Sequence, residues 1–116
     1  MKTEYVEPES AFLEVFGETP LLKVLDFLVI HENFDYSMSD IARLSEVGYA
    51  TLKLFWPRLE QYKIVMQTRK VGKAKMYRLN YQNPVAKKFR ELYWEVTKTV
   101  VHDELKDEKI KVSPVI

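Results

Sequence analysis

The chain has no cysteine, and this absence excludes several kinds of site at once. Neither a disulfide nor a thiolate metal centre can form. Imidazole ligands are limited to His31 and His102, and His31 has no second histidine or clustered acid at ligand spacing. A histidine near a helix end more often caps the helix or faces solvent than binds a metal. We therefore expect no metal site and no cofactor.

Long apolar runs are also missing. No stretch approaches the length needed to cross a bilayer, and Met1–Tyr5 does not begin a signal peptide. We therefore expect a cytoplasmic protein with no membrane partner. The 116 residues are enough for one domain, and hydrophobic and charged contents of 47% and 30% fit a folded globular chain.

Catalytic patterns are absent as well. The sequence has no paired carboxylates on an apolar face, no glycine-rich phosphate loop and no nucleophile near a base. It has only 3 glycines, and Gly72-Lys73 has the context of a hairpin tip. We therefore expect no enzymatic activity.

The charge is unevenly distributed along the chain. The net charge of +1 divides into −7 for residues 1–42, +10 for residues 43–90 and −2 for residues 91–116. A surface that faces phosphates requires such a concentration of positive charge. The middle of the chain is thus a candidate nucleic-acid-binding region.

That same region has the element order of a winged helix-turn-helix. Ser37 and Asp40 have the spacing of a capping box, which predicts a short helix through Leu44. After a turn, Gly48 can cap a second helix whose apolar residues recur at helical spacing. The predicted inward face of this second helix consists of Leu52, Phe55, Leu59 and Tyr62.

Three residues of the second helix do not fit a simple amphipathic pattern. Pro57 is expected to bend the helix or to shorten it. Leu54 and Trp56 are unusual on a helix that faces DNA. We expect both to pack against the wing or a neighbouring helix.

Beyond Tyr62 the pattern changes to two strand-like runs, 64–69 and 75–79, joined by a short turn. Residues 35–36 are expected to add a small third strand. The hairpin carries five basic residues: Arg69, Lys70, Lys73, Lys75 and Arg78. A basic hairpin in this position is typical of a wing.

The runs 36–45, 57–60, 63–65, 68–74 and 77–80 together resemble winged-helix transcriptional regulators. The resemblance is strongest to archaeal members and to the multiple-antibiotic-resistance and arsenic-repressor groups, and covers roughly Pro20 to Asn80. It implies a regulator that binds double-stranded DNA. Such families usually have glycine at the position of Glu46 and serine or threonine at that of Gly48.

The winged-helix geometry assigns roles to the basic and polar residues. The second helix enters the major groove with its N-terminal residues at the base edges. We expect base contacts from Tyr49, Ala50 and Lys53, and phosphate contacts from Arg43, Thr51 and Arg58. In the wing, we expect Arg69, Lys70 and Lys73 to contact phosphates or the minor groove. For Lys75 and Arg78, DNA contact and a solvated position are equally expected.

Helices are predicted on both sides of this unit. Ser10 and Thr19-Pro20 are start signals for two N-terminal helices, and Asn83-Pro84 begins a long C-terminal helix. The apolar seam of the long helix suggests a homodimer, in which a second subunit covers it. The alternative is that this helix folds back on the Pro20 helix within one chain. The residues predicted for the dimer interface are Phe12, Phe16, Val85, Phe89, Leu92, Tyr93, Val96 and Val100.

The predicted fold class is mainly α, of the α+β type: a winged helix-turn-helix with a small antiparallel wing sheet and flanking N- and C-terminal helices. The predicted domains are a mobile acidic arm at 1–9, the DNA-binding domain at 10–82, a dimerisation helix at 83–105 and a frayed tail at 106–116.

Two other functions remain open. The first is a protein-interaction module with a protein partner docked on Tyr49, Phe55 and Trp56. The second is architectural coating of DNA without operator choice.

Overall fold

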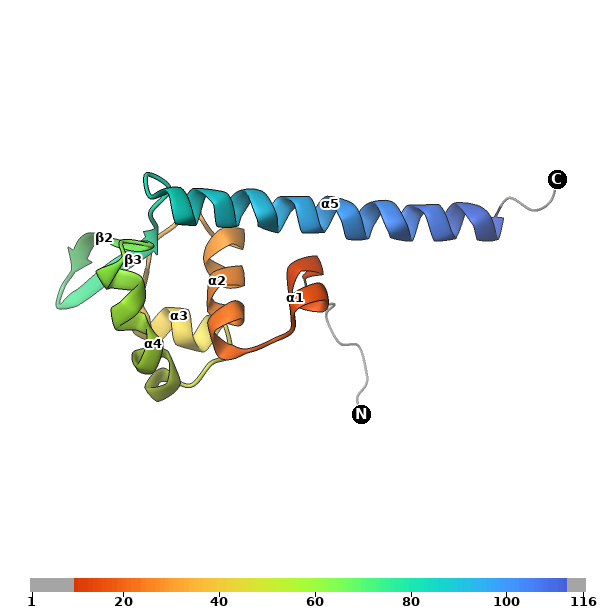
Figure 1. Cartoon of the computed structure of the whole chain (residues 1–116). Helices are drawn as coiled ribbons and strands as arrows, with labels where there is room; N and C mark the ends of the chain where they lie inside the picture. The colour runs from red at the N-terminus through yellow and green to blue at the C-terminus, as the bar shows by residue number, and fades with distance from the viewer. Residues whose placement is uncertain (1–9, 113–116) are drawn as a thin grey trace, which may run out of the picture.

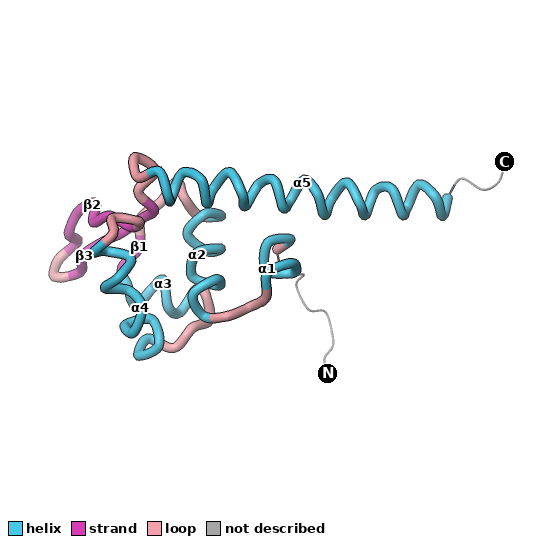
Figure 2. The backbone as a smooth tube through the Cα atoms, in the orientation of Figure 1, coloured by secondary structure: helices cyan, strands magenta, loops and turns pink. Residues whose placement is uncertain are grey.

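The computed structural model describes residues 10–112, with side chains described as far as Lys106. The predicted arm at 1–9 and the tail residues 113–116 lie outside the described residues. Five helices and a three-stranded antiparallel sheet make up the described part of the chain (Figures 1 and 2). In chain order they are α1 (Ala11–Phe16), α2 (Pro20–Ile30), β1 (Tyr36–Ser37), α3 (Met38–Leu44), α4 (Tyr49–Gln61), β2 (Val65–Val71), β3 (Ala74–Leu79) and α5 (Pro84–Val112). This is the predicted winged helix-turn-helix fold.

The sheet has the strand order β1-β3-β2, so β3 lies in the centre. β2 and β3 form the predicted hairpin, and Val71 pairs with Ala74 across a turn of two residues. Gly72 has a φ of 63°, whereas Lys73 does not have a positive φ. Glycine with positive φ at the first turn position is the pattern of a type II′ hairpin, whose twist matches that of the strands.

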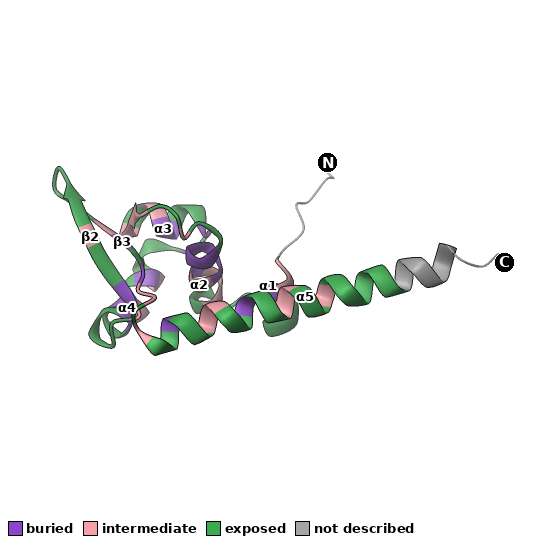
Figure 3. Ribbon diagram, turned by 90° about the horizontal axis from the view of Figure 1, so that it is seen from above, coloured by how far each residue is buried: buried purple, intermediate pink, exposed green. Residues whose placement is uncertain are grey.

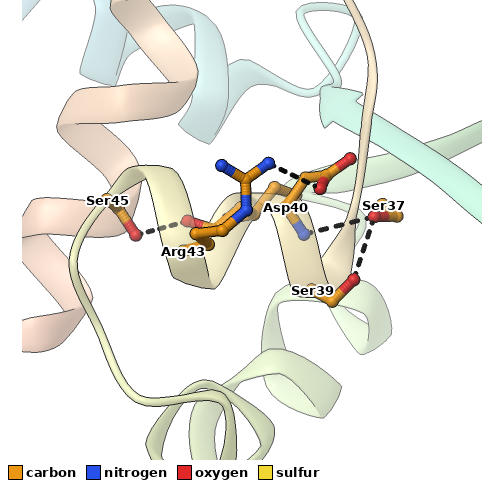
Figure 4. Close-up of polar contacts among 6 residues, drawn as sticks. Ser37, Ser39, Asp40, Arg43 and Ser45 are labelled. Atoms are coloured by element: carbon orange, nitrogen blue, oxygen red, sulfur yellow. Dashed lines mark hydrogen bonds and ion pairs between the residues drawn. The ribbon is translucent and has the colours of Figure 1, made fainter.

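The helices begin where the sequence predicts. The side-chain oxygens of Ser10, Thr19 and Ser37 each accept a hydrogen bond from the amide three residues later. The box at Ser37 is one-sided, however, because the Asp40 carboxylate accepts from the Arg43 guanidinium at 3.0 Å (Figure 4). α3 is therefore capped by the serine hydroxyl, and the acid instead holds a basic side chain.

The core-facing side of α4 differs from the prediction. Leu52, Trp56 and Leu59 are buried, whereas Phe55 is only half-buried and Tyr62 is 61% exposed. Spacings of four and three residues place the three buried side chains on one stripe. The inward face therefore centres on Trp56. Phe55 packs against the core from its edge, and only the prediction of Tyr62 as a member was wrong.

Trp56 and Leu54 have different surroundings. Trp56 is 1% exposed, and its ring meets that of Tyr77 on β3 at a centroid distance of 5.2 Å in an edge-on arrangement. The prediction that Trp56 packs against the wing is confirmed. Leu54 is 81% exposed, so the same prediction for Leu54 was wrong.

Pro57 lies inside α4, and the helix continues past it to Gln61. Proline lacks an amide hydrogen, so one helical hydrogen bond is missing at this point. Pro57 does not end the helix, because Leu59, beyond it, is buried in the core and helps to hold the last turn in place.

The long helix α5 packs first on its own chain. Phe89 and Tyr93 contact Phe12 of α1, with centroid distances of 5.2 and 5.4 Å. The Ser10 hydroxyl donates to the buried carboxylate of Asp26 on α2. Burial and the neighbouring Asp26 carboxylate raise the pKa of Tyr93, so its hydroxyl remains protonated in this junction. These contacts join α1, α2 and α5.

The predicted dimer-interface residues therefore fall into two groups. Phe12 and Tyr93 are each 2% exposed and fill the core of their own chain. The long helix thus packs within one chain, as the alternative expects, but mainly on α1 and not on the Pro20 helix. Phe89, Val96 and Val100 are half-buried. Phe16, Val85 and Leu92 are exposed.

The second half of α5 extends beyond the rest of the domain (Figures 1 and 3). All residues from Val101 to Lys106 are exposed, and the helix continues to Val112, past its predicted end at Leu105. None of the helices among residues 10–112 is long and apolar enough to span a membrane.

Candidate nucleic-acid interface

The N-terminal half of α4 lies on the side of the winged domain away from α5 (Figure 1). Its first residue, Tyr49, is 47% exposed, and the Lys53 ammonium lies 5.4 Å from the centroid of the Tyr49 ring. A cation over an aromatic face is held by the ring quadrupole. Tyr49 and Lys53, both predicted to contact bases, thus form one unit at the exposed start of α4.

A hollow of about 480 Å³ separates this unit from the wing tip. Tyr49 lines it from α4, and Lys73 and Lys75 line it from the wing. The Ser37 and Ser39 hydroxyls also border the hollow and lie 3.3 Å apart (Figure 4). Glu60 is the acid in the lining. The structure therefore brings Lys53, Lys73 and Lys75 to one side of the molecule.

Lys70 belongs to the same cluster, because it pairs directly with Lys75 across the hairpin. Directly opposed residues of an antiparallel pair share a face of the sheet, and like charges there are destabilising. Two ammonium groups in this position raise the local positive potential. An anion bound between them would relieve the repulsion.

The other two wing cations lie on the opposite face of the hairpin. β3 side chains alternate, so Arg78 and Met76 point away from the face that carries Lys75 and Tyr77. Arg69 pairs with Met76 and therefore shares the Arg78 face. The wing carries its lysines and its arginines on different faces.

Arg69 is already engaged within the chain. Its guanidinium donates two hydrogen bonds to Asp35, at 2.9 and 3.0 Å, and Thr68 also donates to that carboxylate. The Arg69 guanidinium, and then the Thr68 hydroxyl, lower the pKa of Asp35 from 3.8 to about 2. The carboxylate in turn raises the pKa of Arg69. Thr68 occupies an irregularity in the β2–β3 register between Gln67 and Arg69.

The remaining predicted contacts are spread over the helix-turn-helix. Arg43 on α3 is exposed and forms an ion pair with Asp40 at 3.0 Å. Thr51 is half-buried, whereas Ala50 and Arg58 are exposed on α4. Arg58 lies on the flank of α4 away from Lys53, since five residues correspond to about 500° of helical rotation.

The turn between α3 and α4 contains a strained residue. Glu46 has a φ of 61°, in the left-handed region that favours glycine. The Lys23 ammonium of α2 donates to the Glu46 carbonyl at 3.1 Å. This contact joins the turn to the supporting helix and helps to fix the entry of α4.

Sequence reasoning missed two features of this surface. Leu54 is exposed, although a helical projection that places Leu52 and Leu59 inside puts it outside. Asp35 neutralises Arg69 from 34 residues away, and no local pattern indicates this pairing. The proposed protein-docking surface also changes, because Trp56 is buried and leaves Tyr49 and the half-buried Phe55 without a common exposed face.

No protein-family model and no curated protein matches the sequence. Solved structures do match. MepR, described as a transcription regulator of the Staphylococcus aureus multidrug efflux pump MepA, has 22% identity and a TM-score of 0.57, covering 87% of this chain and 79% of MepR. Lactococcus lactis ZitR in apo form, a mutant, has 17% identity and a TM-score of 0.60, covering 86% of this chain and 80% of ZitR.

Two further structures extend the comparison. Bacillus subtilis YusO has 18% identity and a TM-score of 0.57, covering 90% of this chain and 77% of YusO. Wild-type ZitR in complex with DNA has 16% identity and a TM-score of 0.52, covering 74% of this chain and 60% of ZitR. The chain therefore has the fold of winged-helix transcription regulators of the multiple-antibiotic-resistance type.

Proposed function

We propose that the chain is a double-stranded DNA-binding transcription regulator that acts as a homodimer. The N-terminal half of α4 enters the major groove, and the wing contacts the DNA backbone or minor groove. In this arrangement Tyr49, Ala50 and Lys53 face base edges, and Lys70, Lys73 and Lys75 face phosphates. The proposal assigns no enzymatic activity and places the protein in the cytoplasm, where it meets DNA.

The observation that carries the proposal is the convergence of Lys53, Lys70, Lys73 and Lys75. None of these ammonium groups forms an ion pair with a carboxylate among the described side chains. Nearby, the Arg69 guanidinium is paired with Asp35. Four such cations beside a groove-sized helix are suited to a polyanion, and the DNA complex of the structural neighbour ZitR supports the same choice.

The homodimer is supported by α5. A helix of 29 residues is about 44 Å long, and its second half projects past α1 (Figure 1). Val85 and Leu92, seven residues apart on one stripe of α5, are 60% and 45% exposed. A second copy of α5 packed on these side chains would bury them. A two-fold dimer would also present two α4 helices to successive turns of DNA.

Duplex DNA binding measured over a salt series tests the proposal. Three phosphate contacts in each subunit predict a logarithmic salt slope of about −2.7 per subunit, so the affinity falls about fortyfold or more between 50 and 200 mM salt. An affinity that changes less than about threefold over this range would contradict the interface. Comparison of selected with random duplexes then separates a regulator from an architectural protein, which would bind both within a few-fold.

A further inference from the structure

Leu54 is the most exposed large hydrophobic side chain in the described part of the chain, at 81%. It lies two residues after Leu52, which is 0% exposed, and therefore about 200° around the helix from it. Ala50 and Pro57, at spacings of four and three residues from Leu54, are exposed on the same stripe. The outward centre of α4 is thus apolar.

The flanks of this stripe are positively charged. Lys53 precedes Leu54 on the side of the wing, and Arg58 lies on the other flank; both are exposed. Beyond Lys53 the wing adds Lys73 and Lys75. This arrangement, apolar side chains flanked by cations, complements a surface in which apolar groups lie between two rows of phosphates. The major groove of duplex DNA is such a surface.

The apolar group that a base edge presents in the major groove is the C5 methyl of thymine. The side chains of Ala50 and Leu54 have no hydrogen-bond donor or acceptor, so they cannot recognise a base by hydrogen bonding. We infer that Leu54, with Ala50 beside it, selects thymine by packing on C5 methyl groups. This inference rests on the proposed function and deepens it. In this inference Leu54 and Ala50 recognise thymine methyl groups, and Lys53 makes the polar contact with a base.

The test needs a duplex selected from random sequence by the full chain. Each thymine in the selected site is then replaced, one at a time, by deoxyuridine, which removes only the C5 methyl. Affinities are measured for the unaltered chain, for Leu54→Ala and for the control Leu21→Ala. Leu21 is an exposed leucine on α2 with no assigned role. Leu54→Ala leaves the core untouched, and circular dichroism verifies that each variant is folded.

We expect replacement at one or more positions to weaken binding of the unaltered chain about fourfold per lost methyl contact. The same replacement should change binding of Leu54→Ala less than twofold, and Leu21→Ala should behave like the unaltered chain. An equal loss with and without the leucine, or no loss at any thymine, would overturn methyl recognition while DNA binding stands. Failure to bind any duplex at low salt would overturn the proposed function and this inference together.

Discussion

Arg69 on β2 and Asp35, just before β1, form a two-point ion pair across 34 residues of sequence, with N–O distances of 2.9 and 3.0 Å. The Asp35 side chain is 15% exposed, while that of Arg69 is 63% exposed. Charge-assisted bonds with two parallel contacts fix orientation as well as distance. The pair therefore holds the base of the wing against the segment that leads into α3.

Asp35→Asn is expected to lower the free energy of unfolding at neutral pH, because the amide cannot replace the charged acceptor. The pKa of Asp35 is about 2 when folded, below its ordinary value of 3.8. A lowered pKa stabilises the fold above about pH 4, and this stabilisation is lost as the pH falls toward 2. Urea unfolding at pH 7, 4 and 2.5 should show the difference between the proteins shrinking with pH. A difference that grows at low pH would contradict this assignment.

Lys70→Ala is expected to change DNA binding and stability in opposite directions. It removes one phosphate contact from each subunit, so the salt slope should become less steep by about 1 per subunit. It also removes the like-charge pair with Lys75, which should raise the free energy of unfolding by about 0.2 to 1 kcal/mol. Lys88→Ala on α5 is the control, since Lys88 pairs with Glu91 at 3.7 Å, away from the wing. Equal salt slopes for the two variants would remove Lys70 from the interface.

Trp56→Ala is expected to lower the free energy of unfolding by about 3 to 5 kcal/mol, the usual loss for a buried aromatic residue. Trp56 is 1% exposed and contacts Tyr77, so the change opens a cavity between α4 and the sheet. Leu54→Ala, two residues away, should stay within about 0.5 kcal/mol of the unaltered chain. Thermal and denaturant unfolding of both variants measures the contrast. A similar loss at the two positions would contradict the orientation of α4.

Glu46→Gly is expected to raise the free energy of unfolding by up to about 1 kcal/mol. The φ of 61° at Glu46 strains any residue with a Cβ, and glycine removes the strain. The gain is limited because glycine has more freedom in the unfolded chain. Glu46→Ala serves as the control, since it removes the carboxylate but retains the Cβ. A gain with alanine as large as that with glycine would assign the effect to charge.

Leu92→Glu is expected to dissociate the proposed homodimer, because a carboxylate would have to be buried in an apolar contact. Sedimentation equilibrium should show a shift toward the monomer, and DNA affinity should fall with it. Lys98→Glu is the control. It also introduces an acid on α5, but six residues correspond to about 600° of rotation, which places it on another side of the helix. A monomeric unaltered chain would contradict the dimer directly.

Local chemistry made several elements predictable. Ser10, Thr19 and Ser37 cap helices because their hydroxyls reach amides only three residues away. Gly72 turns the hairpin because its positive φ costs little without a Cβ. Each of these decisions involves residues close in sequence. The fold class and the bounds of most elements followed from them.

Local sequence did not determine which of Phe55 and Trp56 is fully buried. Both spacings, 52-55-59 and 52-56-59, are compatible with an amphipathic helix, so periodicity alone does not choose between them. The structure places Trp56 inside because the ring meets Tyr77 on β3. That choice rotates α4 and turns Leu54 outward.

The sequence by itself determined that this is a winged helix with a basic middle segment, because capping, turn formation and charge distribution are local properties. Only the tertiary structure decided which cations are unpaired and free to contact DNA. Asp35 pairs with the exposed Arg69 and neutralises its charge, strand pairing joins Lys70 to Lys75, and Phe12 and Tyr93 are enclosed within one chain. These outcomes depend on contacts between distant segments, whose geometry is set by packing of the whole core.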